Sequence, residues 1–177
     1  AGVSYAVVIS TNAGLWRYLI GDTIRFTSTD PYRFRITGRT KHHINVFGEE
    51  LVIENAETAM AKVCDKHQAT VADFTAGPVF MDGNTKGKHE WIVEFHQKPA
   101  DVALFAKDLD AELQALNSDY EAKRYKNMTL APLSLHVARK NLFYDWLKEK
   151  GKVGGQHKVP RLSNTREFVD KLLEMNA

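Results

Sequence analysis

Residues 14–50 read GLWRYLIGDTIRFTSTDPYRFRITGRTKHHINVFGEE, and this stretch decides the expected fold. It holds two short signatures, Arg17–Asp22 and Ile36–Lys41, on either side of a turn at Asp30-Pro31. Runs rich in β-branched and aromatic residues surround both signatures, and turn formers bound these runs. The pattern predicts a small antiparallel β-sheet in which one acid and one base flank a hairpin.

The acid and the base of the two signatures have chemistry that suits a nucleotide. Asp22 follows Gly21 between β-rich runs, and its carboxylate can accept two hydrogen bonds at once, as a ribose diol requires. Arg39 follows Gly38, which we expect to end a strand, and its planar charged guanidinium suits a phosphate or a ribose edge. An ordinary surface acid and base beside turns would explain the same spacing, because short motifs often match by chance.

Length, charge and cysteine usage limit the class of protein. The chain has 177 residues, which is enough for one good core or two small ones. Its net charge of +2 is small and interspersed, so the sequence gives no indication of nucleic-acid binding. Its one cysteine, Cys64, excludes an internal disulfide framework, fits a reducing compartment and lies on an apolar helical stripe, which predicts a core position. No apolar run reaches membrane-spanning length, and no secretory leader is recognisable, so we expect a cytoplasmic protein without membrane contact.

Hydrophobic periodicity predicts an α+β fold in two parts. Residues 1–40 form the antiparallel β subdomain, and the polar segment Lys41–His43 is the expected boundary. Residues 41–177 form an α/β sandwich with helices packed on one face of a sheet. The expected strands cover residues 5–10, 15–20, 23–27, 32–37, 70–74, 77–81, 90–95 and 132–137. The expected helices cover residues 53–66, 101–116, 120–125 and 141–149.

A basic loop near the C-terminus is the last stretch whose residues suggest a binding or catalytic role. Residues 154–161 read GGQHKVPR, so that Lys158 lies between two glycines and Pro160. A lysine on a mobile loop can reach an active site, withdraw from it, and carry a compact charge to a phosphate. The residues alone favour a solvated basic loop, or a weak anion-binding patch made with neighbouring cations. These neighbours are Lys150, Lys152, His157 and Arg161.

Taken together, these stretches resemble the adenylate-forming superfamily of acyl-CoA ligases, peptide-synthetase adenylation domains and luciferases. In that superfamily a Tyr/Arg-x-x-Gly-Asp segment precedes a Gly-Arg-x-Asp/Lys-Asp-x-Ile-Lys/Asn-x-x-Gly segment, which here runs from Gly38 to Gly48. Within it the chain is most similar to the auxin-responsive acyl-acid amido synthetases, whose Gly-Leu-Tyr-Arg-Tyr-Arg-x-Gly-Asp segment resembles Gly14–Asp22. The stretch from Leu116 to Arg124 also resembles one of theirs, for which we expect a structural role. Gly48–Leu51 resembles the Gly-Glu-Glu-Leu version of non-plant members, which predicts a non-plant, bacterial origin.

The resemblance implies roles for the residues on the nucleotide side. Amido synthetases carry Gly-Gln-x-Lys-x-Pro-Arg near the C-terminus, so Lys158 is the expected counterpart of the catalytic lysine of the superfamily. There a carboxylic acid attacks the α-phosphate of ATP to give acyl-AMP, and Lys158 would stabilise the charge that builds on that phosphate. Asp22 would hold the ribose, Arg39 would assist at ribose or phosphate, and Tyr18 would line the same pocket. Mg²⁺ would arrive with ATP, without a dedicated protein site.

The resemblance also implies roles on the acceptor side. An amino acid amine would attack the acyl-AMP after the C-terminal domain, residues 41–177, rotates about a hinge at Lys41. Gly48, Gln156 and Arg161 would support the acceptor path and the lysine loop. Residues 1–40 would then be the end of the large nucleotide-binding domain. The product would be an amide.

Some elements of such an enzyme do not occur in these residues. No Ser/Thr/Gly-rich phosphate loop and no recognisable acyl pocket are present, and we expect them in an upstream domain of the same chain. The chain also opens at Ala1 and enters a strand at once, which predicts a C-terminal fragment that is inactive alone. We expect no metal site, because His42-His43 would point to opposite faces of a strand without a third ligand.

Two other functions fit the sequence. An acyl-CoA ligase would share the adenylation step and use a thiol acceptor, although such ligases place their lysine in a Thr-x-x-Gly-Lys setting. A non-catalytic nucleotide-binding or interaction module would keep the nucleotide-facing residues without turnover.

Overall fold

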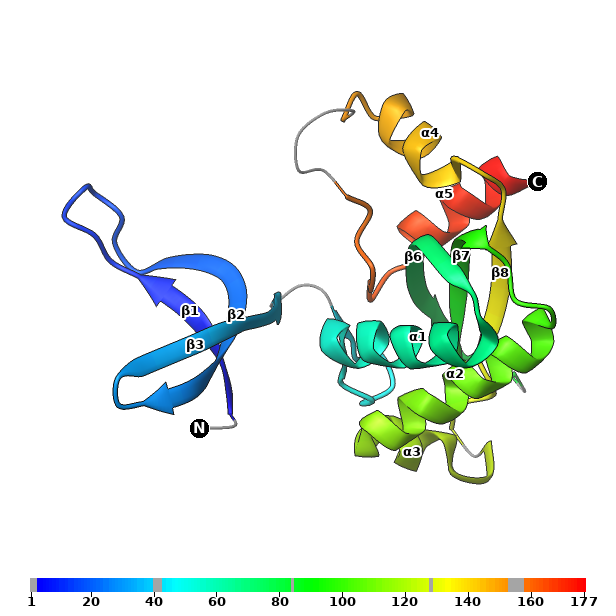
Figure 1. Ribbon diagram of the computed structural model, residues 1–177, viewed down its shortest axis with the longest axis horizontal. Helices are drawn as coiled ribbons and strands as arrows, with labels where there is room; N and C mark the ends of the chain where they lie inside the picture. Colours follow the sequence, from blue (N-terminus) through cyan, green and yellow to red (C-terminus); the bar gives the residue numbers. More distant parts are fainter. Residues whose placement is uncertain (1–2, 40–42, 84, 128, 153–157) are drawn as a thin grey trace.

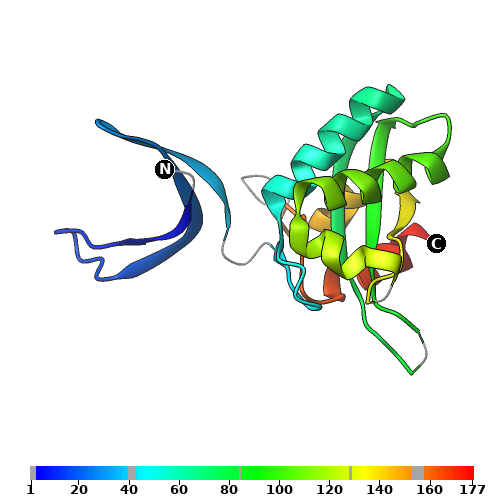
Figure 2. The same ribbon diagram turned by 90° about the horizontal axis from the view of Figure 1, so that it is seen from below.

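The computed structural model describes residues 3–39, 43–83, 85–127, 129–152 and 158–177 (Figure 1). Two views at right angles show a small N-terminal sheet beside a larger α/β domain (Figures 1 and 2). Among the helices described, none is long and apolar enough to cross a lipid bilayer.

The N-terminal sheet has three antiparallel strands in the order β1-β2-β3, as expected for the first 40 residues. Its strands are β1 (Ser4–Ile9), β2 (Tyr18–Thr29) and β3 (Tyr32–Arg39). The prediction of two separate strands around Gly21 is wrong, because β2 continues through this residue. The prediction that Gly38 ends a strand is also wrong, since β3 continues to Arg39. In both cases the positive φ of a glycine accommodates an irregularity within a strand, so the strand does not stop.

The α/β domain contains two sheets. A two-stranded sheet that the sequence analysis did not predict follows the expected boundary and consists of β4 (His43–Ile44) and β5 (Leu51–Val52). The main sheet consists of β6 (Thr70–Val79), β7 (Lys88–Gln97) and β8 (Ser134–Ala138). The β6 and β7 strands form the expected hairpin, although β6 is one strand where two were predicted. β8 pairs parallel with β7, which requires the crossover connection that the helices between them provide.

The helices of the α/β domain follow the predicted pattern except for the last one. The described helices are α1 (Ile53–His67), α2 (Val102–Leu116), α3 (Ser118–Arg124), α4 (Leu142–Glu149) and α5 (Glu167–Asn176), with a short 3-10 turn, η1 (Tyr125–Asn127). Asp101 caps α2 as predicted and accepts a hydrogen bond from the Leu104 N–H at 2.9 Å. α5 was not predicted, because it lies beyond the last stretch that the sequence analysis interpreted.

Helices cover both faces of the main sheet, so the prediction of helices on one face is wrong. Successive residues of β7 point to opposite faces. Trp91 and Val93 belong to the core under α1 and α2, whereas Ile92 belongs to a second core under α4 and α5. Figure 1 shows these two helix pairs on opposite sides of the sheet. Cys64 packs against the first core, and burial raises the pKa of its thiol, which agrees with the predicted structural position.

The stretch from Leu116 to Arg124 makes structural contacts. Asn117 separates α2 from α3, and its side chain accepts a hydrogen bond from the Tyr120 N–H at 2.8 Å. The buried Asp110 accepts hydrogen bonds from the Tyr120 hydroxyl at 2.7 Å and from Arg124 Nη2 at 2.7 Å. This cluster joins α3 to α2 and satisfies polar groups that the core would otherwise leave unpaired.

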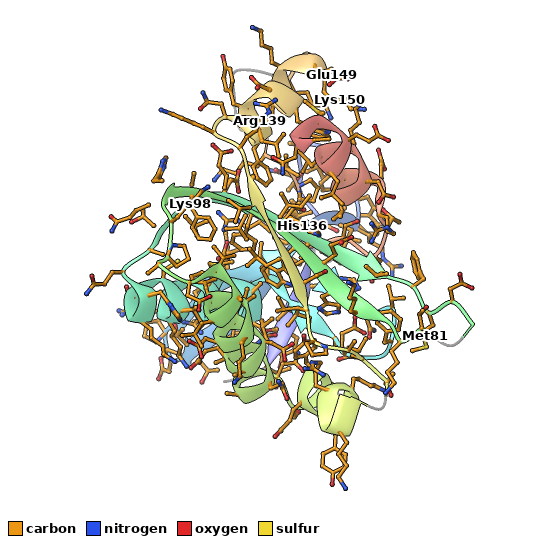
Figure 3. The ribbon with its side chains drawn as sticks, turned by 90° about the vertical axis from the view of Figure 1, so that its right-hand side faces the viewer. Met81, Lys98, His136, Arg139, Glu149 and Lys150 are labelled. Atoms are coloured by element: carbon orange, nitrogen blue, oxygen red, sulfur yellow. The ribbon has the colours of Figure 1, made fainter. Side chains whose placement is uncertain are left out.

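Glu90 joins three elements of the second core. It lies on β7 with 8% of its surface exposed, and its carboxylate accepts hydrogen bonds from Arg166 Nη2 and from His136 Nε2, both at 2.8 Å. Figure 3 shows His136 on β8. Burial alone would raise the pKa of Glu90, but Arg166 and His136 outweigh burial and hold this pKa below its usual value. The same guanidinium also contacts Asp170 at 2.6 Å.

The depressed pKa of Glu90 predicts how stability depends on pH. A carboxylate whose pKa is lower in the folded state stabilises the fold above its unfolded pKa of about 4.3, and this contribution is lost as pH falls through the folded value. We expect Glu90→Gln to lower the free energy of unfolding by about 1–3 kcal/mol at pH 7 and by clearly less near pH 3. Urea unfolding at both pH values measures this difference. An equal loss at both pH values would contradict the assignment.

Candidate functional site

The Gly21-Asp22 signature forms a bulge in β2. Thr23 pairs with Ala6 and Leu19 pairs with Val8, so the three residues from Ile20 to Asp22 face the single residue between Ala6 and Val8 on β1. Gly21 has a φ of +90°, which residues with a Cβ rarely adopt. Bulges of this kind re-aim the side chains next to them. The glycine of the signature therefore has a structural use, because its positive φ allows the bulge that precedes Thr23.

The structure brings the acid and the base of the two signatures together. Asp22 on β2 and Arg39 on β3 are register partners of the antiparallel pair, and Asp22 is half-buried. Tyr18 is the first residue of β2 and is 53% exposed. The two signatures thus meet in the register of β2 and β3. Lys41 and Gln156 lie outside the described residues.

The segment that carries Lys158 is seated on the free edge of β6. The Thr75 hydroxyl donates a hydrogen bond to the Pro160 carbonyl oxygen at 2.6 Å. The Ala76 N–H donates to the Arg161 carbonyl oxygen at 2.9 Å, and the Ala76 carbonyl oxygen accepts from the Ser163 N–H at 3.1 Å. These contacts extend the main sheet by one short parallel segment. The backbone after Lys158 is therefore fixed.

Side chains secure the same segment. Val159 and Leu162 are buried, whereas Lys158 itself is exposed. The Arg161 guanidinium lies 4.5 Å from the ring centroid of Phe74, and its Nε lies 3.4 Å from a carboxylate oxygen of Glu57 on α1. Arg161 thus fastens the base of the segment to β6 and α1, and Lys158 projects from a fixed base.

A half-buried carboxylate on β6 lies within electrostatic reach of the lysine. Burial raises the pKa of Asp73, while the positive charges of Arg161 and Lys158 act in the opposite direction. Asp73 also accepts a hydrogen bond from the Phe74 N–H at 2.9 Å. In this structure Lys158 therefore lies at the β6 edge of the α/β domain, near Asp73.

Gly48 lies on the loop between β4 and β5 and has a φ of +80°. A Cβ at this position would lie 3.2 Å from Lys123 Nζ of α3, so only a glycine fits without a shift. The loop therefore packs against the Lys123 side chain of α3.

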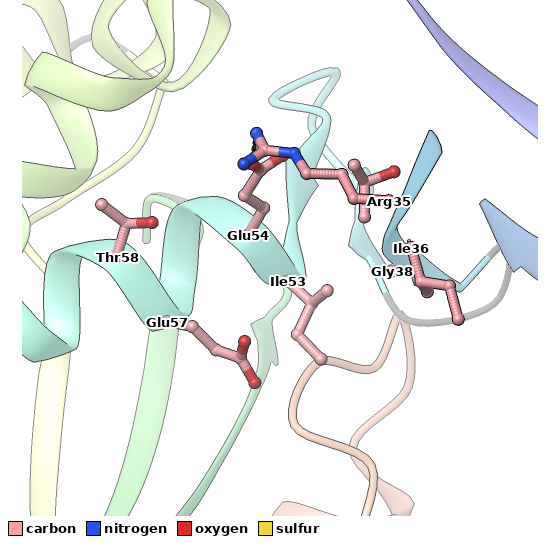
Figure 4. Close-up of a pocket in the computed structure, with 8 residues that line it drawn as sticks. Arg35, Ile36, Gly38, Ile53, Glu54, Glu57 and Thr58 are labelled. Carbon is pink, nitrogen blue, oxygen red and sulfur yellow. Dashed lines mark hydrogen bonds and ion pairs between the residues drawn. The ribbon is translucent and has the colours of Figure 1, made fainter. Parts of the chain in front are cut away.

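The N-terminal sheet and the α/β domain meet at Glu54, a residue that the sequence analysis missed. Glu54 lies in the first turn of α1 and pairs with Arg25 of β2 at 3.2 Å and with Arg35 of β3 at 2.9 Å. Figure 4 shows Arg35 reaching Glu54 across a cavity of about 320 Å³ between β3 and α1. A Cβ at Gly38 would lie 2.8 Å from Ile53, so the two parts approach closely there. No sequence pattern predicts that an acid at the start of a helix will pair with two arginines on strands that lie 29 and 19 positions away.

The ion pairs of Glu54 are too exposed to hold the two parts firmly. The exposed fractions of the side chains are 32% for Arg25, 58% for Arg35 and 33% for Glu54. Pairs of this kind contribute about 0.2–1 kcal/mol each and are screened by salt. The junction therefore favours one arrangement of the two parts only weakly.

Two family models match the chain. Residues 54–167 match the model of the GH3 family C-terminal domain, and residues 1–39 match the model of the GH3 family central domain. Curated relatives include the probable indole-3-acetic acid-amido synthetase GH3.1 of Arabidopsis thaliana, 27% identical over 189 residues. Another is the jasmonoyl--L-amino acid synthetase GH3.5 of Oryza sativa subsp. japonica, 28% identical over 172 residues. The alignments cover 97% and 92% of this chain but 31% and 29% of these relatives, so the chain spans less than a third of their length.

Solved structures with the same fold agree with these matches. The GH3.15 acyl acid amido synthetase superposes with a TM-score of 0.76 at 23% identity, over 98% of this chain and 34% of that chain. The AtGH3.15 acyl acid amido synthetase in complex with 2,4-DB gives a TM-score of 0.75 at 22% identity, over 98% of this chain and 32% of that chain. These likenesses confirm the expected fold class.

The junction at Glu54 predicts a salt-dependent change of shape. Glu54→Gln removes both ion pairs and keeps the size of the side chain, so we expect a larger radius of gyration by small-angle X-ray scattering at low salt. Near 1 M salt the unaltered chain should approach the variant, because the Debye length falls to about 3 Å. Glu57→Gln is the control, since Glu57 lines the same cavity but pairs with Arg161 within the α/β domain. Identical scattering of the unaltered chain and E54Q at low salt would contradict this role.

Proposed function

Because the chain belongs to the GH3 family, we propose that it is the C-terminal part of an ATP-dependent acyl-acid amido synthetase. The observation that carries the proposal is the seat of Lys158. A lysine in the Gly-Gln-x-Lys-x-Pro-Arg pattern projects from a segment that Thr75 and Ala76 bind to the edge of β6. A fixed base with an exposed ammonium suits delivery of one positive charge to a phosphate.

The first half-reaction joins a small carboxylic acid to AMP. A carboxylate oxygen attacks the α-phosphorus of ATP, the bond to the β-phosphate breaks, and pyrophosphate leaves. Negative charge builds on the α-phosphate oxygens, and the Lys158 ammonium stabilises it where water is excluded. Asp22 accepts hydrogen bonds from the ribose hydroxyls, Arg39 assists at ribose or phosphate, and Tyr18 lines the pocket. Mg²⁺ enters with ATP and neutralises phosphate charge.

The second half-reaction forms the amide. The amine of an amino acid attacks the acyl carbon of acyl-AMP, AMP leaves, and the amine loses a proton. For this step the C-terminal domain, residues 41–177, rotates about Lys41, which withdraws Lys158 and brings the loop with Gly48 to the acceptor path. Gln156 and Arg161 support the lysine segment. The weak junction at Glu54 is compatible with such a rotation, since few interactions have to break.

Exposed apolar side chains of the N-terminal sheet support the proposal that an upstream domain of the same protein covers this sheet. Large apolar side chains of this sheet are exposed, and contiguous exposed apolar surface usually marks an interface. These side chains are Tyr5, Val8, Tyr18, Leu19, Tyr32, Phe34 and Ile36. We propose that the preceding part of a large nucleotide-binding domain covers them, and that residues 1–40 complete that domain. The phosphate loop and the acyl pocket would lie there. The single cysteine and the need for ATP favour the cytoplasm.

The product of the full-length protein tests this function. The protein is supplied with ATP, Mg²⁺ and a panel of carboxylic acids that includes indole-3-acetic and jasmonic acid, with amino acids in one reaction and CoA in another. We expect mass spectrometry to detect AMP and an amide with amino acids only. A thioester with CoA would indicate an acyl-CoA ligase, and no AMP in either reaction would indicate a non-catalytic module.

Lys158→Ala in the full-length protein should abolish most of the adenylation rate. We expect ATP–pyrophosphate exchange to fall by at least about a hundredfold, because a single charge aimed at a transition state contributes that much. The matched control is Lys152→Ala, which removes another exposed lysine before the same segment. Unchanged exchange in K158A, or an equal fall in K152A, would overturn the assignment.

A further inference from the structure

The loop between β4 and β5 is fastened by a buried carboxylate that the proposed function does not use. Glu49 follows Gly48 in this loop and is completely buried, with an exposed fraction of 0%. One of its carboxylate oxygens accepts a hydrogen bond from the Phe47 N–H at 2.7 Å within the loop. The other contacts Nε2 of His89 on β7 at 2.8 Å. Glu49 thus closes the loop on itself and joins it to the central strand of the main sheet.

His89 is as deeply buried as its partner. Its exposed fraction is 0%, and its ring lies 5.2 Å from the ring of Tyr120 on α3, tilted by 30°. Among the described residues, its Nδ1 is buried without a hydrogen-bond partner. Burial would raise the pKa of Glu49, but the hydrogen bond and the charge of His89 outweigh burial and lower it. The carboxylate is therefore ionised, and Nε2–H of His89 donates the hydrogen bond to it.

Close packing secures the same loop around the buried pair. A Cβ at Gly87 would lie 2.5 Å from the Phe47 ring, so this ring lies directly on the backbone before β7. The Asn117 side chain donates a hydrogen bond to the Glu50 carbonyl oxygen at 3.2 Å. The loop therefore contacts Gly87 just before β7, His89 near the start of β7, and Asn117 between α2 and α3, so it has to move with the α/β domain as one body.

The buried pair is better explained by positioning than by stability. Burying the Glu49 carboxylate removes its charge from water, at a cost that its hydrogen bonds to Phe47 and His89 must offset, so the contact is weak evidence for a role in stability. The best-attested role of buried polar or charged groups is to specify one conformation of the chain over alternatives. Here the arrangement specified is that of the backbone at Gly48, since Phe47 and Glu49 on either side of it are both held by the pair.

We propose that Glu49 and His89 are positioning residues for the acceptor step: they fix the Gly48 loop on the α/β domain so that rotation of this domain delivers the loop in one conformation. This inference rests on the proposed function. The adenylation step depends on the Lys158 segment, which Thr75 and Ala76 hold on β6. This segment meets the loop beside β4, where the Asn45 N–H donates a hydrogen bond to Asn164 Oδ1 at 2.7 Å, whereas Glu49 and His89 hold the other end of the loop. Loosening the loop should therefore slow amide formation and spare adenylation.

The test compares His89→Leu and His89→Gln in the full-length protein. H89L removes the donor to Glu49, and we expect amide formation from amino acid to fall by about tenfold to a hundredfold, as misplacement by about 1 Å does. ATP–pyrophosphate exchange should stay within about twofold of the unaltered protein. H89Q keeps an N–H donor and should restore most of the amide-forming rate. Glu49→Gln, which keeps an oxygen for the Phe47 N–H, should fall between the two.

Two results would overturn the proposal. One is an equal loss of both half-reactions in H89L together with a loss of thermal stability, which a merely structural role would give. The other is unchanged hydrogen exchange of the Phe47 amide in H89L, because this amide loses its order if the pair positions the loop. Hydrogen exchange of the Phe47 amide does not require turnover, so it tests the order of the loop even if H89L has little activity. If the unaltered protein forms no acyl-AMP, the proposed function is refuted. The exchange result then still tests whether Glu49 and His89 position the Gly48 loop.

Discussion

β7 is buried on both faces and paired on both edges, and the positions of the other elements depend on it. Trp91 and Val93 enter the core under α1 and α2, while Ile92 enters the core under α4 and α5. The polar residues of the strand are used as anchors: His89 holds the β4–β5 loop, Glu90 holds Arg166, and Glu94 accepts a hydrogen bond from the Asn141 N–H at the start of α4 at 2.6 Å. Each anchor would cost more unpaired than it contributes paired, so the strand specifies where its neighbours lie.

The two parts of the chain are held by forces of very different strength. Within the α/β domain, the lysine segment and the β4–β5 loop are attached by buried contacts, namely the Pro160 carbonyl on Thr75 and Glu49 on His89. Across the junction, Glu54 forms ion pairs with Arg25 and Arg35, and the three side chains are about one third to more than one half exposed. Buried contacts resist rearrangement, whereas exposed ion pairs contribute about 1 kcal/mol or less. The α/β domain is therefore held together firmly, whereas the exposed ion pairs of Glu54 constrain its orientation relative to the N-terminal sheet only weakly.

The sequence predicted the local elements better than the long-range ones. The apolar stripes of residues 53–66 and 101–116 and the hairpin after residue 70 depend on nearby side chains, and all three formed as expected. The continuous β2 and β6 strands were missed. Gly21 was expected to separate two strands, whereas it allows a bulge, and a second strand was expected to begin at Gly77, whereas this glycine lies within β6 and packs against α5. The pairing of Asp22 with Arg39 follows from the hairpin. The seat of the lysine segment could not be predicted, since its hydrogen bond joins residues 85 positions apart, and the same holds for Glu54 and its arginines.

The proposed reorientation of the α/β domain between the two half-reactions can be tested by a distance measurement. Spin labels at Thr29→Cys on β2 and Lys107→Cys on α2 of the full-length protein lie on the two parts, at exposed positions. Double electron–electron resonance would record their separation first with ATP and a carboxylic acid, and then with a stable acyl-AMP analogue and an amino acid. Two distinct distance distributions are expected, because one domain presents Lys158 in the first step and the Gly48 loop in the second. A single unchanged distribution in both conditions would contradict a domain that alternates between the two steps.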